Sequence, residues 1–199
     1  MGRTRRVDRS GLSDCGLLII IHQSVNNEMS NMRTVTIENP DATNNQQLPT
    51  TVVIRAESPQ HPNLDALWKV KKALALSLYP AESDYSYRPD VLAAPNVCFL
   101  VAEVNAEFVG CGAAVNQGEY GEIKSMFVHE KMRGQRIGER LLRKLETYLR
   151  EQKLPVAYLE TGIDSHSALR LYERMGYTNR GPFGEYTNDP FCVFMEKAL

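Results

Sequence analysis

Two arginines and two glycines stand together in the segment 126–138, MFVHEKMRGQRIG, in a pattern that suits a bound phosphate. A strand-like run ends there and an amphipathic helix begins, so the first N–H groups of that helix have no partner within it. These N–H groups carry the positive end of the helix dipole, and Arg133 and Arg136 add charge at the same place. The pattern predicts a phosphate-binding turn at 133–138. A glycine-containing connection with solvated arginines is the alternative.

The periodicity of the apolar residues predicts the elements that must position this turn. Alternating and β-branched runs predict strands at 51–57, 97–104, 108–115, 122–128, 156–160 and 191–196. Helical spacing predicts helices at 64–78, 137–149 and 164–175, and we expect a loop at 81–95. The order β-α-β-β-β-α-β-α-β predicts an α/β fold (α+β in some schemes), with a mixed sheet and helices on both faces.

Composition and charge exclude several classes of function. The chain has 199 residues, of which 43% are apolar and 24% charged, and these proportions are typical of a soluble globular protein. Its net charge of −1 argues against non-specific binding to duplex DNA. The apolar run 17–21 is too short to span a membrane. We therefore expect no nucleic-acid partner and no membrane segment.

The cysteines give no sign of a disulfide framework or of a metal centre. The four of them, at 15, 98, 111 and 192, form no C-x-x-C pair, and no metal-ligand spacing occurs elsewhere in the chain. A chain of this length can build a core without disulfide bonds. We expect free thiols, no bound metal and a cytoplasmic location.

The first 49 residues are predicted to lie outside the folded domain, which we place at 50–199. Arginines precede the apolar stretch 16–21 in the order of a secretory signal, but the stretch is too short and has no cleavage site. We interpret 1–49 as an extension that is flexible or partly non-native. A natural start at Met29 or Met32 is the alternative interpretation.

Two motifs resemble those of the GNAT family of N-acetyltransferases. The segment 133–138, RGQRIG, is similar to the family's Q/R-x-x-G-x-G/A signature, which binds the pyrophosphate of coenzyme A. The segment 165–177, SHSALRLYERMGY, is similar to its N-x-x-A-x-x-L-Y-x-x-x-G-F/Y. Arg136 replaces the central glycine of the first motif, and Ser165 replaces the asparagine of the second. We expect Arg136 to adopt the conformation of a first helical turn, which any L-residue can adopt.

The resemblance covers roughly residues 51–197 and implies both a fold and a set of contacts. The implied fold is a mostly antiparallel central sheet whose fourth and fifth strands splay apart. The implied co-substrate is acetyl-CoA, with the coenzyme-binding residues Met126, Phe127, Val128, Arg133, Gly134, Gln135, Arg136, Ile137, Gly138 and Ser165. The backbone N–H groups of the first three would hold the pantetheine and the acetyl oxygen.

Transfer of an acetyl group to an amine needs an unprotonated amine and a proton for the departing thiolate. Tyr172 stands where the family places the acid beside the sulfur, and a core aromatic is the alternative. Glu122 and Glu160, at the start of one strand and the end of another, are the candidate bases, acting directly or through water. For Glu122, an exposed charge at a strand end is the alternative.

The segment between the first helix and the second strand stands where the family builds its acceptor wall. It contains Tyr79, Tyr85, Tyr87 and Arg88. A solvated loop whose tyrosines cap the core is the alternative, and Tyr186 is open to the same two interpretations.

The resemblance implies direct transfer from acetyl-CoA to the primary amine of a small or amino-acid-like acceptor. One alternative is a degenerate member that binds coenzyme A as a sensor or interaction module, which the departures at Arg136 and Ser165 would favour. The other is an enzyme that acetylates proteins or peptides. The sequence does not identify the acceptor, and it leaves a homodimer open.

Overall fold

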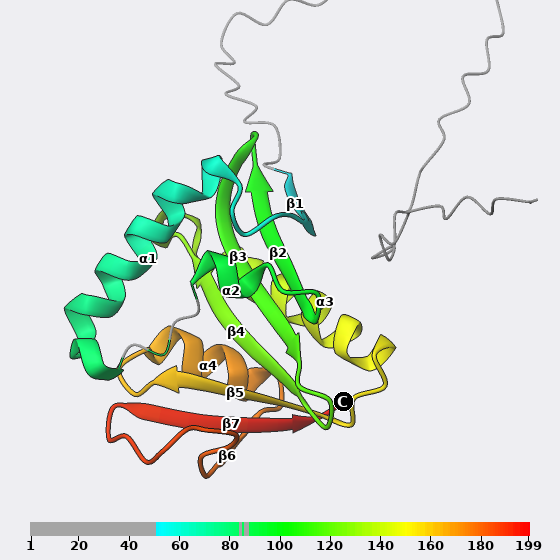
Figure 1. The fold of residues 1–199 in the computed structure, drawn as a ribbon. Coiled ribbons are helices and arrows are strands. Elements are labelled where there is room, and N and C mark those ends of the chain that lie inside the picture. The colour runs from blue at the N-terminus through cyan, green and yellow to red at the C-terminus, as the bar shows by residue number, and fades with distance from the viewer. Residues whose placement is uncertain (1–50, 84, 86–87) are drawn as a thin grey trace, which may run out of the picture. The chain divides into compact units, whose positions relative to one another are not determined.

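A computed structural model of the chain describes residues 51–83, 85 and 88–199 (Figure 1). The extension expected at 1–49 lies outside these residues, as does Tyr87. The division of the chain into an extension and a domain therefore stays a prediction.

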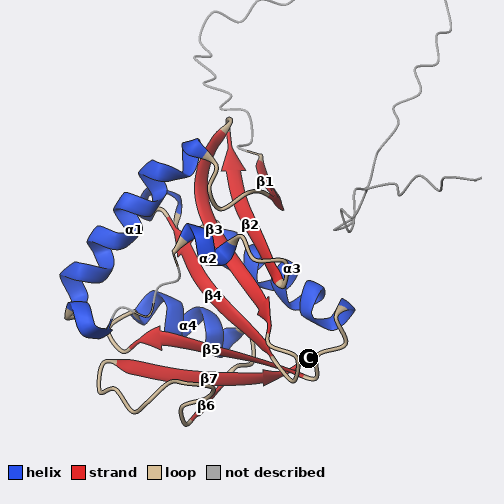
Figure 2. Ribbon diagram, viewed as in Figure 1, coloured by secondary structure: helices blue, strands red, loops and turns tan. Residues whose placement is uncertain are grey.

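Seven strands in the described part of the chain form one sheet, in the order β1-β2-β3-β4-β5-β7-β6 (Figure 2). Neighbouring strands run antiparallel, except for the parallel pair β4–β5. The strands are β1 (Val52–Ala56), β2 (Val97–Val104), β3 (Glu107–Asn116), β4 (Gly121–Val128), β5 (Val156–Gly162), β6 (Thr178–Arg180) and β7 (Cys192–Ala198). This sheet confirms the predicted mixed, mostly antiparallel fold.

Helices cover both faces of the sheet, as predicted (Figure 1). The α-helices of the described part are α1 (Asp65–Leu78), α2 (Pro89–Leu92), α3 (Ile137–Glu151) and α4 (His166–Arg174). Three short 3-10 turns accompany them, η1 (Pro62–Leu64), η2 (Ala81–Ser83) and η3 (Glu130–Met132). Buried side chains of α3 and α4 join one apolar cluster with the sheet, and those of α1 and α2 join a second.

Two short elements were not predicted, and each has a physical reason. α2 lies in the segment expected to be a loop, where Pro89 provides a preset start and Leu92 is 1% exposed. β6 has three residues without an apolar alternation, and it forms by pairing with β7, Asn179 opposite Met195. Elements this short depend on tertiary contacts rather than on periodicity.

The hairpin β2–β3 turns through Asn105 and Ala106, which have φ angles of 49° and 64°. Two consecutive residues with positive φ are typical of a type I′ turn, whose twist matches that of the flanking strands. The expected connection at 105–107 is therefore one residue shorter in the structure, because Glu107 already belongs to β3.

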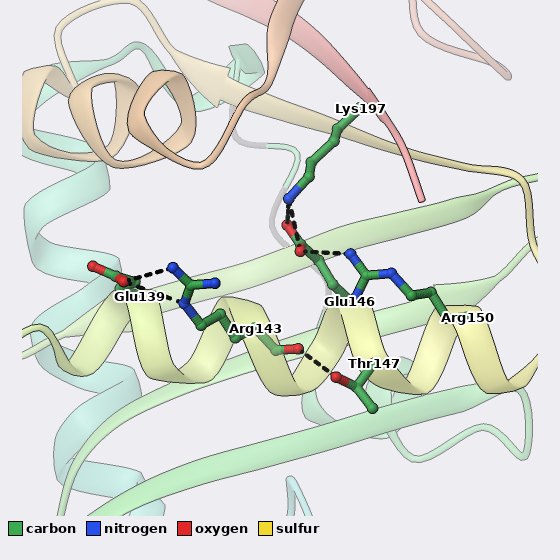
Figure 3. A network of polar contacts seen from close by, with 6 residues as sticks. All are labelled: Glu139, Arg143, Glu146, Thr147, Arg150 and Lys197. Atoms are coloured by element: carbon green, nitrogen blue, oxygen red, sulfur yellow. Dashed lines mark hydrogen bonds and ion pairs between the residues drawn. The ribbon is translucent and has the colours of Figure 1, made fainter.

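α3 is anchored on the sheet by an apolar stripe and by one buried carboxylate. Leu141, Leu142, Leu145 and Leu149 are fully buried, and burial of each such side chain contributes about 1.5–3 kcal/mol. Glu146, 2% exposed, accepts hydrogen bonds from Lys197 of β7 at 2.7 and 2.8 Å and from Arg150 at 3.2 Å (Figure 3). These contacts fix α3, and with it the turn that precedes it, against the sheet.

Candidate active site

The strands β4 and β5 pair only at their first residues and then separate. Their register joins Gly121 to Ala157 and Ile123 to Leu159, and no pairing between them continues beyond that point in the described residues. The predicted splay is therefore confirmed. Beyond Ile123, the edge of β4 that faces β5 has no strand partner among the described residues, so its backbone groups can serve a ligand.

A pocket of about 180 Å³ lies where the two strands separate. It is lined from β4 by Lys124, Ser125 and Met126; from β5 by Glu160, Thr161 and Gly162; from α4 and its start by Ser165, Ala168 and Tyr172; from α1 and the residues after it by Lys71, Tyr79, Ser83 and Tyr85; and from the last segment by Phe191 and Cys192. The pocket brings together Glu160, Tyr172, Ser165 and Met126 from the predicted site.

A bulge in β4 shapes the side of this pocket. Opposite Cys111–Ala113 of β3, β4 has one extra residue, and Ser125 has a φ of 54°. The Oγ of Ser125 is buried without a hydrogen-bond partner among the described residues, which makes it a polar atom that a ligand could pair. Phe127 and Val128 lie beyond the bulge and pair with β3 opposite Cys111 and Gly110.

The predicted phosphate turn connects η3 to α3 and is open to a ligand. Gly134 has a φ of 82°, and nothing lies within 4 Å of a side chain built there. The N–H groups of Ile137, Gly138 and Glu139 open α3 without partners inside the helix. Gly138 allows close packing, because a Cβ there would lie 3.1 Å from Leu171 of α4. These features suit a phosphate group.

Arg136 does not adopt the conformation expected for it. It is the N-cap of α3 and lies in the left-handed region, with φ 56° and ψ 21°, instead of the first helical turn. That region favours glycine, the residue that the family motif has at this position. For an arginine the conformation costs about 1–2 kcal/mol.

Arg133, Gln135 and Ile137 also belong to the turn that leads into α3. Arg133 donates from Nε to the Val128 carbonyl oxygen at 3.3 Å, which holds its side chain against the end of β4. The Gln135 amide contacts the sulfur of Met132 at 3.9 Å, and Ile137 is buried. Ser165 is the N-cap of α4, and its Oγ lies 3.0 Å from the Tyr79 hydroxyl.

Tyr172 lies both in the core and at the pocket, and its role as the acid stays a prediction. Its ring is 4% exposed and packs edge-on against Tyr177, with 5.7 Å between the ring centroids, so it belongs to the core. It also lines the pocket. Burial, with a further contribution from the charge of Glu160, raises the pKa of Tyr172 well above its ordinary value, so the phenol stays protonated at neutral pH.

The two candidate bases differ in their surroundings. Glu160 lines the pocket. Burial raises the pKa of its carboxyl, and the positive charge of Lys124 opposes that rise. Glu122 is 2% exposed and is not among the residues that line the pocket. Its Oε1 accepts from the Tyr186 hydroxyl at 2.7 Å, and its Oε2 accepts from the Gln117 amide at 3.0 Å. The alternative of an exposed strand-end charge is therefore wrong for Glu122.

Lys124 is a functional candidate that sequence reasoning missed. Its residue is 5% exposed, its Nζ lies 3.6 Å from Glu122 and 3.9 Å from Glu160, and it donates to the Tyr186 hydroxyl. A signal was present, because a lysine two residues after a glutamate in an otherwise apolar strand places both charges on one face. Tyr186, which the sequence left undecided, joins this cluster.

Of the residues predicted to form the acceptor wall, some line the pocket and one does not. Tyr79 and Tyr85 line the pocket, and the Tyr85 hydroxyl donates to Asp189 at 3.2 Å. Arg88 is exposed and pairs with Asp90 at 2.9 Å. In the described part of the chain, no group of three His, Cys, Asp or Glu residues is placed to hold a metal ion, and no helix is long and apolar enough to cross a membrane.

The model of the acetyltransferase (GNAT) family matches residues 64–177, which include the phosphate turn, Lys124, Glu160 and Tyr172. The chain belongs to the GNAT acetyltransferase family. The resemblance predicted from the two motifs is thereby confirmed, and the protein is an acetyltransferase. Tyr186 and Cys192 lie outside the matched residues, in the part of the site that the family pattern does not cover.

Individual relatives support the assignment to this family. The IAA acetyltransferase of Azospirillum brasilense is 41% identical over 150 residues, which cover 74% of this chain and 98% of that protein. A Klebsiella pneumoniae crystal structure, whose name assigns it to the acyl-CoA N-acyltransferases, is 35% identical with a TM-score of 0.63, covering 74% and 97% of the two chains. The PaiA N-acetyltransferase of Thermoplasma acidophilum, solved in complex with coenzyme A, shares the fold at 15% identity and a TM-score of 0.57, covering 75% and 99%.

Proposed function

We propose that this GNAT acetyltransferase moves the acetyl group of acetyl-CoA directly to the primary amine of a small acceptor bound in the pocket. One observation carries the proposal: Glu160, Tyr172 and the bulge of β4 line one pocket. A base, an acid and a strand edge with free backbone groups are the three parts that the reaction needs.

The coenzyme would be held at two places. Arg133 and the open N–H groups at the start of α3 suit its diphosphate, and Gly134 and Gly138 keep that surface free of side chains. The unpaired edge of β4 at Met126–Val128 suits the pantetheine arm and the acetyl oxygen. Ser165 would contribute at the start of α4, where it lines the pocket.

Glu160 is the base in this proposal. Its carboxylate faces the pocket, whereas both oxygens of Glu122 already accept hydrogen bonds from the protein. A proton passes from the acceptor's ammonium to Glu160, and the nitrogen forms its bond to the acetyl carbon as the carbon–sulfur bond breaks. The Tyr172 hydroxyl gives its proton to the departing sulfur, and the resulting phenolate takes up the second proton, which the nitrogen loses as it becomes an amide.

The acceptor is assigned only by class. The relative from Azospirillum brasilense is named for acetylation of a small molecule, and the pocket, lined by five segments, has a volume of about 180 Å³, which suits a compact acceptor. Three tyrosines, Tyr79, Tyr85 and Tyr172, line it beside Glu160. An amine attached to an apolar or aromatic group fits these surroundings.

The experiment is a thiol-release assay with acetyl-CoA and a panel of small amines, in which matched alcohols serve as non-basic controls. We expect coenzyme A release with at least one amine and none with the alcohols. Calorimetry on Arg133→Glu should show weakened coenzyme binding. Lys153→Glu, a charge reversal just beyond the other end of α3, should leave it unchanged. Coenzyme binding without transfer to any amine or peptide would instead identify a sensor.

A further inference from the structure

Lys124 carries a buried charge between the two splayed strands. Its side chain is 4% exposed, and a buried ammonium is tolerated only beside groups that compensate its charge. Those groups come from both strands: Glu122 of β4 at 3.6 Å and Glu160 of β5 at 3.9 Å. The ammonium therefore bridges the two strands at the point where they separate.

The two carboxylates are held differently. Glu122 is fixed by Tyr186 and Gln117 and does not face the pocket. Glu160 does face it and is 13% exposed at its side chain. Lys124 also donates to the Tyr186 hydroxyl, so Glu122 and Tyr186 together hold the ammonium in place beside Glu160.

The charges of this cluster have a simple balance. Two carboxylates and one ammonium sum to −1, and an acceptor that enters as an ammonium ion brings the sum to zero. When the acceptor's proton moves to Glu160, the sum stays zero, because Lys124 and Glu122 remain an ion pair. Transfer of the first proton to Glu160 therefore leaves no uncompensated charge in the buried cluster.

We propose that Lys124 is a positioning residue that keeps Glu160 ionised and ready to take the acceptor's proton, with Tyr186 and Glu122 holding Lys124 in place. The proposal rests on the proposed function in that Glu160 is taken as the base. Lys124 itself neither gives nor takes a proton. Its part is electrostatic, because an ammonium about 4 Å away favours the charged form of a carboxylate.

Other groups also act on Glu160. From the last segment of the chain, Cys192 forms a hydrogen bond with it that lowers its pKa, and Asp189 raises its pKa by repulsion. Tyr172 of α4 and Tyr85 line the same pocket as this carboxylate; burial raises the pKa of both phenols, and the charge of Glu160 adds to the rise. None of these four groups is changed in the test, so they contribute equally to every variant.

The test compares Lys124→Met with Glu122→Gln. Loss of the ammonium should raise the pKa of Glu160, so the acidic limb of kcat/KM should move to higher pH by about one unit. Loss of the Glu122 charge should lower that pKa and move the limb to lower pH. The acceptor should be an alkylamine with a pKa of about 10, like that of lysine, so that its own titration lies outside the window.

Two further variants separate electrostatics from structure. The double variant Glu122→Gln/Lys124→Met removes both charges, and its limb should lie between those of the single variants. Lys124→Arg keeps the charge and should keep the limb near that of the parent protein. A merely structural role for Lys124 would lower the rate without moving the limb, and that result, or a shift of both single variants in the same direction, would overturn the proposal.

A measurement without turnover keeps this proposal separate from the proposed function. Carbon-13 NMR of protein labelled at the glutamate carboxyl carbons reports the titration of Glu160, assigned by the signal lost in Glu160→Gln. The pKa should rise in Lys124→Met and fall in Glu122→Gln even if no amine is acetylated. An unchanged titration in Lys124→Met would refute the role of Lys124 while leaving acetyl transfer intact.

Discussion

The hydroxyl of Tyr79, at the end of α1, lies 3.0 Å from the Oγ of Ser165, at the start of α4. This hydrogen bond joins the end of α1 to the start of α4, 86 residues apart in the sequence, and both residues line the pocket. The Tyr79 ring lies against Gly162, so closely that a Cβ on Gly162 would overlap it. One wall of the pocket therefore depends on the absence of a side chain at Gly162.

Gly162→Ala should displace the Tyr79 ring and break its bond to Ser165. Overpacking at a tight contact costs about 1–3 kcal/mol, so we expect a lower melting temperature and a higher KM for the acceptor. Gly181→Ala is the matched control, because nothing lies within 4 Å of a side chain built there. Thermal unfolding and steady-state kinetics measure the two effects, and equal behaviour of both variants would contradict the packing argument.

Arg136→Gly should stabilise the protein. It relieves a left-handed arginine, worth about 1–2 kcal/mol, and loses part of that gain to the greater freedom of glycine in the unfolded chain. We expect a net gain of about 0.5–1 kcal/mol in the free energy of unfolding, measured with urea. Arg133→Gly is the control, because Arg133 has a φ of −68° and no strain to relieve. It should be neutral or destabilising.

Glu146→Gln should destabilise the protein more than Glu139→Gln does. Glu146 is buried and holds Lys197 and Arg150, and hydrogen bonds to charged groups contribute about 1.5–3 kcal/mol (Figure 3). Glu139 pairs with Arg143, whose side chain is 64% exposed, and such surface pairs contribute less than about 1 kcal/mol. Urea unfolding of the two variants measures the difference, and equal losses would show that the tie between α3 and β7 is not stabilising.

The fold was largely predictable because its longer elements have clear periodicity. α3 has a continuous apolar stripe, and the predicted strand at 97–104 coincides with β2. The short elements α2 and β6 lacked such a pattern. The left-handed conformation of Arg136 was not predictable either, since a glycine in the family motif does not tell which backbone conformation an arginine in its place adopts.

The candidate site was predictable in its parts but not in their grouping. Glu160 and Tyr172 were found from strand position and motif, and both line the pocket. Lys124 acquires its role only because the parallel pairing of β4 and β5 brings Glu160 near it and the loop before β7 brings Tyr186. Such a cluster depends on contacts between segments far apart in the sequence, which periodicity does not report.

Tyr172→Phe should slow acetyl transfer while leaving coenzyme affinity and stability nearly intact. The substitution keeps the packing against Tyr177 and removes only the hydroxyl. Because burial raises the pKa of Tyr172, the parent phenol is a proton donor throughout the neutral range. General acid help contributes about 10²–10⁴-fold, so we expect kcat to fall within or somewhat below that range, with little change in KM.

Tyr177→Phe is the control for this prediction, since Tyr177 is equally buried but does not line the pocket. It should transfer acetyl at the parent rate. Rates must be compared in single turnovers, where chemistry and not product release is measured, because a slow release step would hide the loss. If Tyr172→Phe then reacts as fast as the parent protein, Tyr172 is a core aromatic, and water or the proton of the acceptor amine must protonate the departing thiolate.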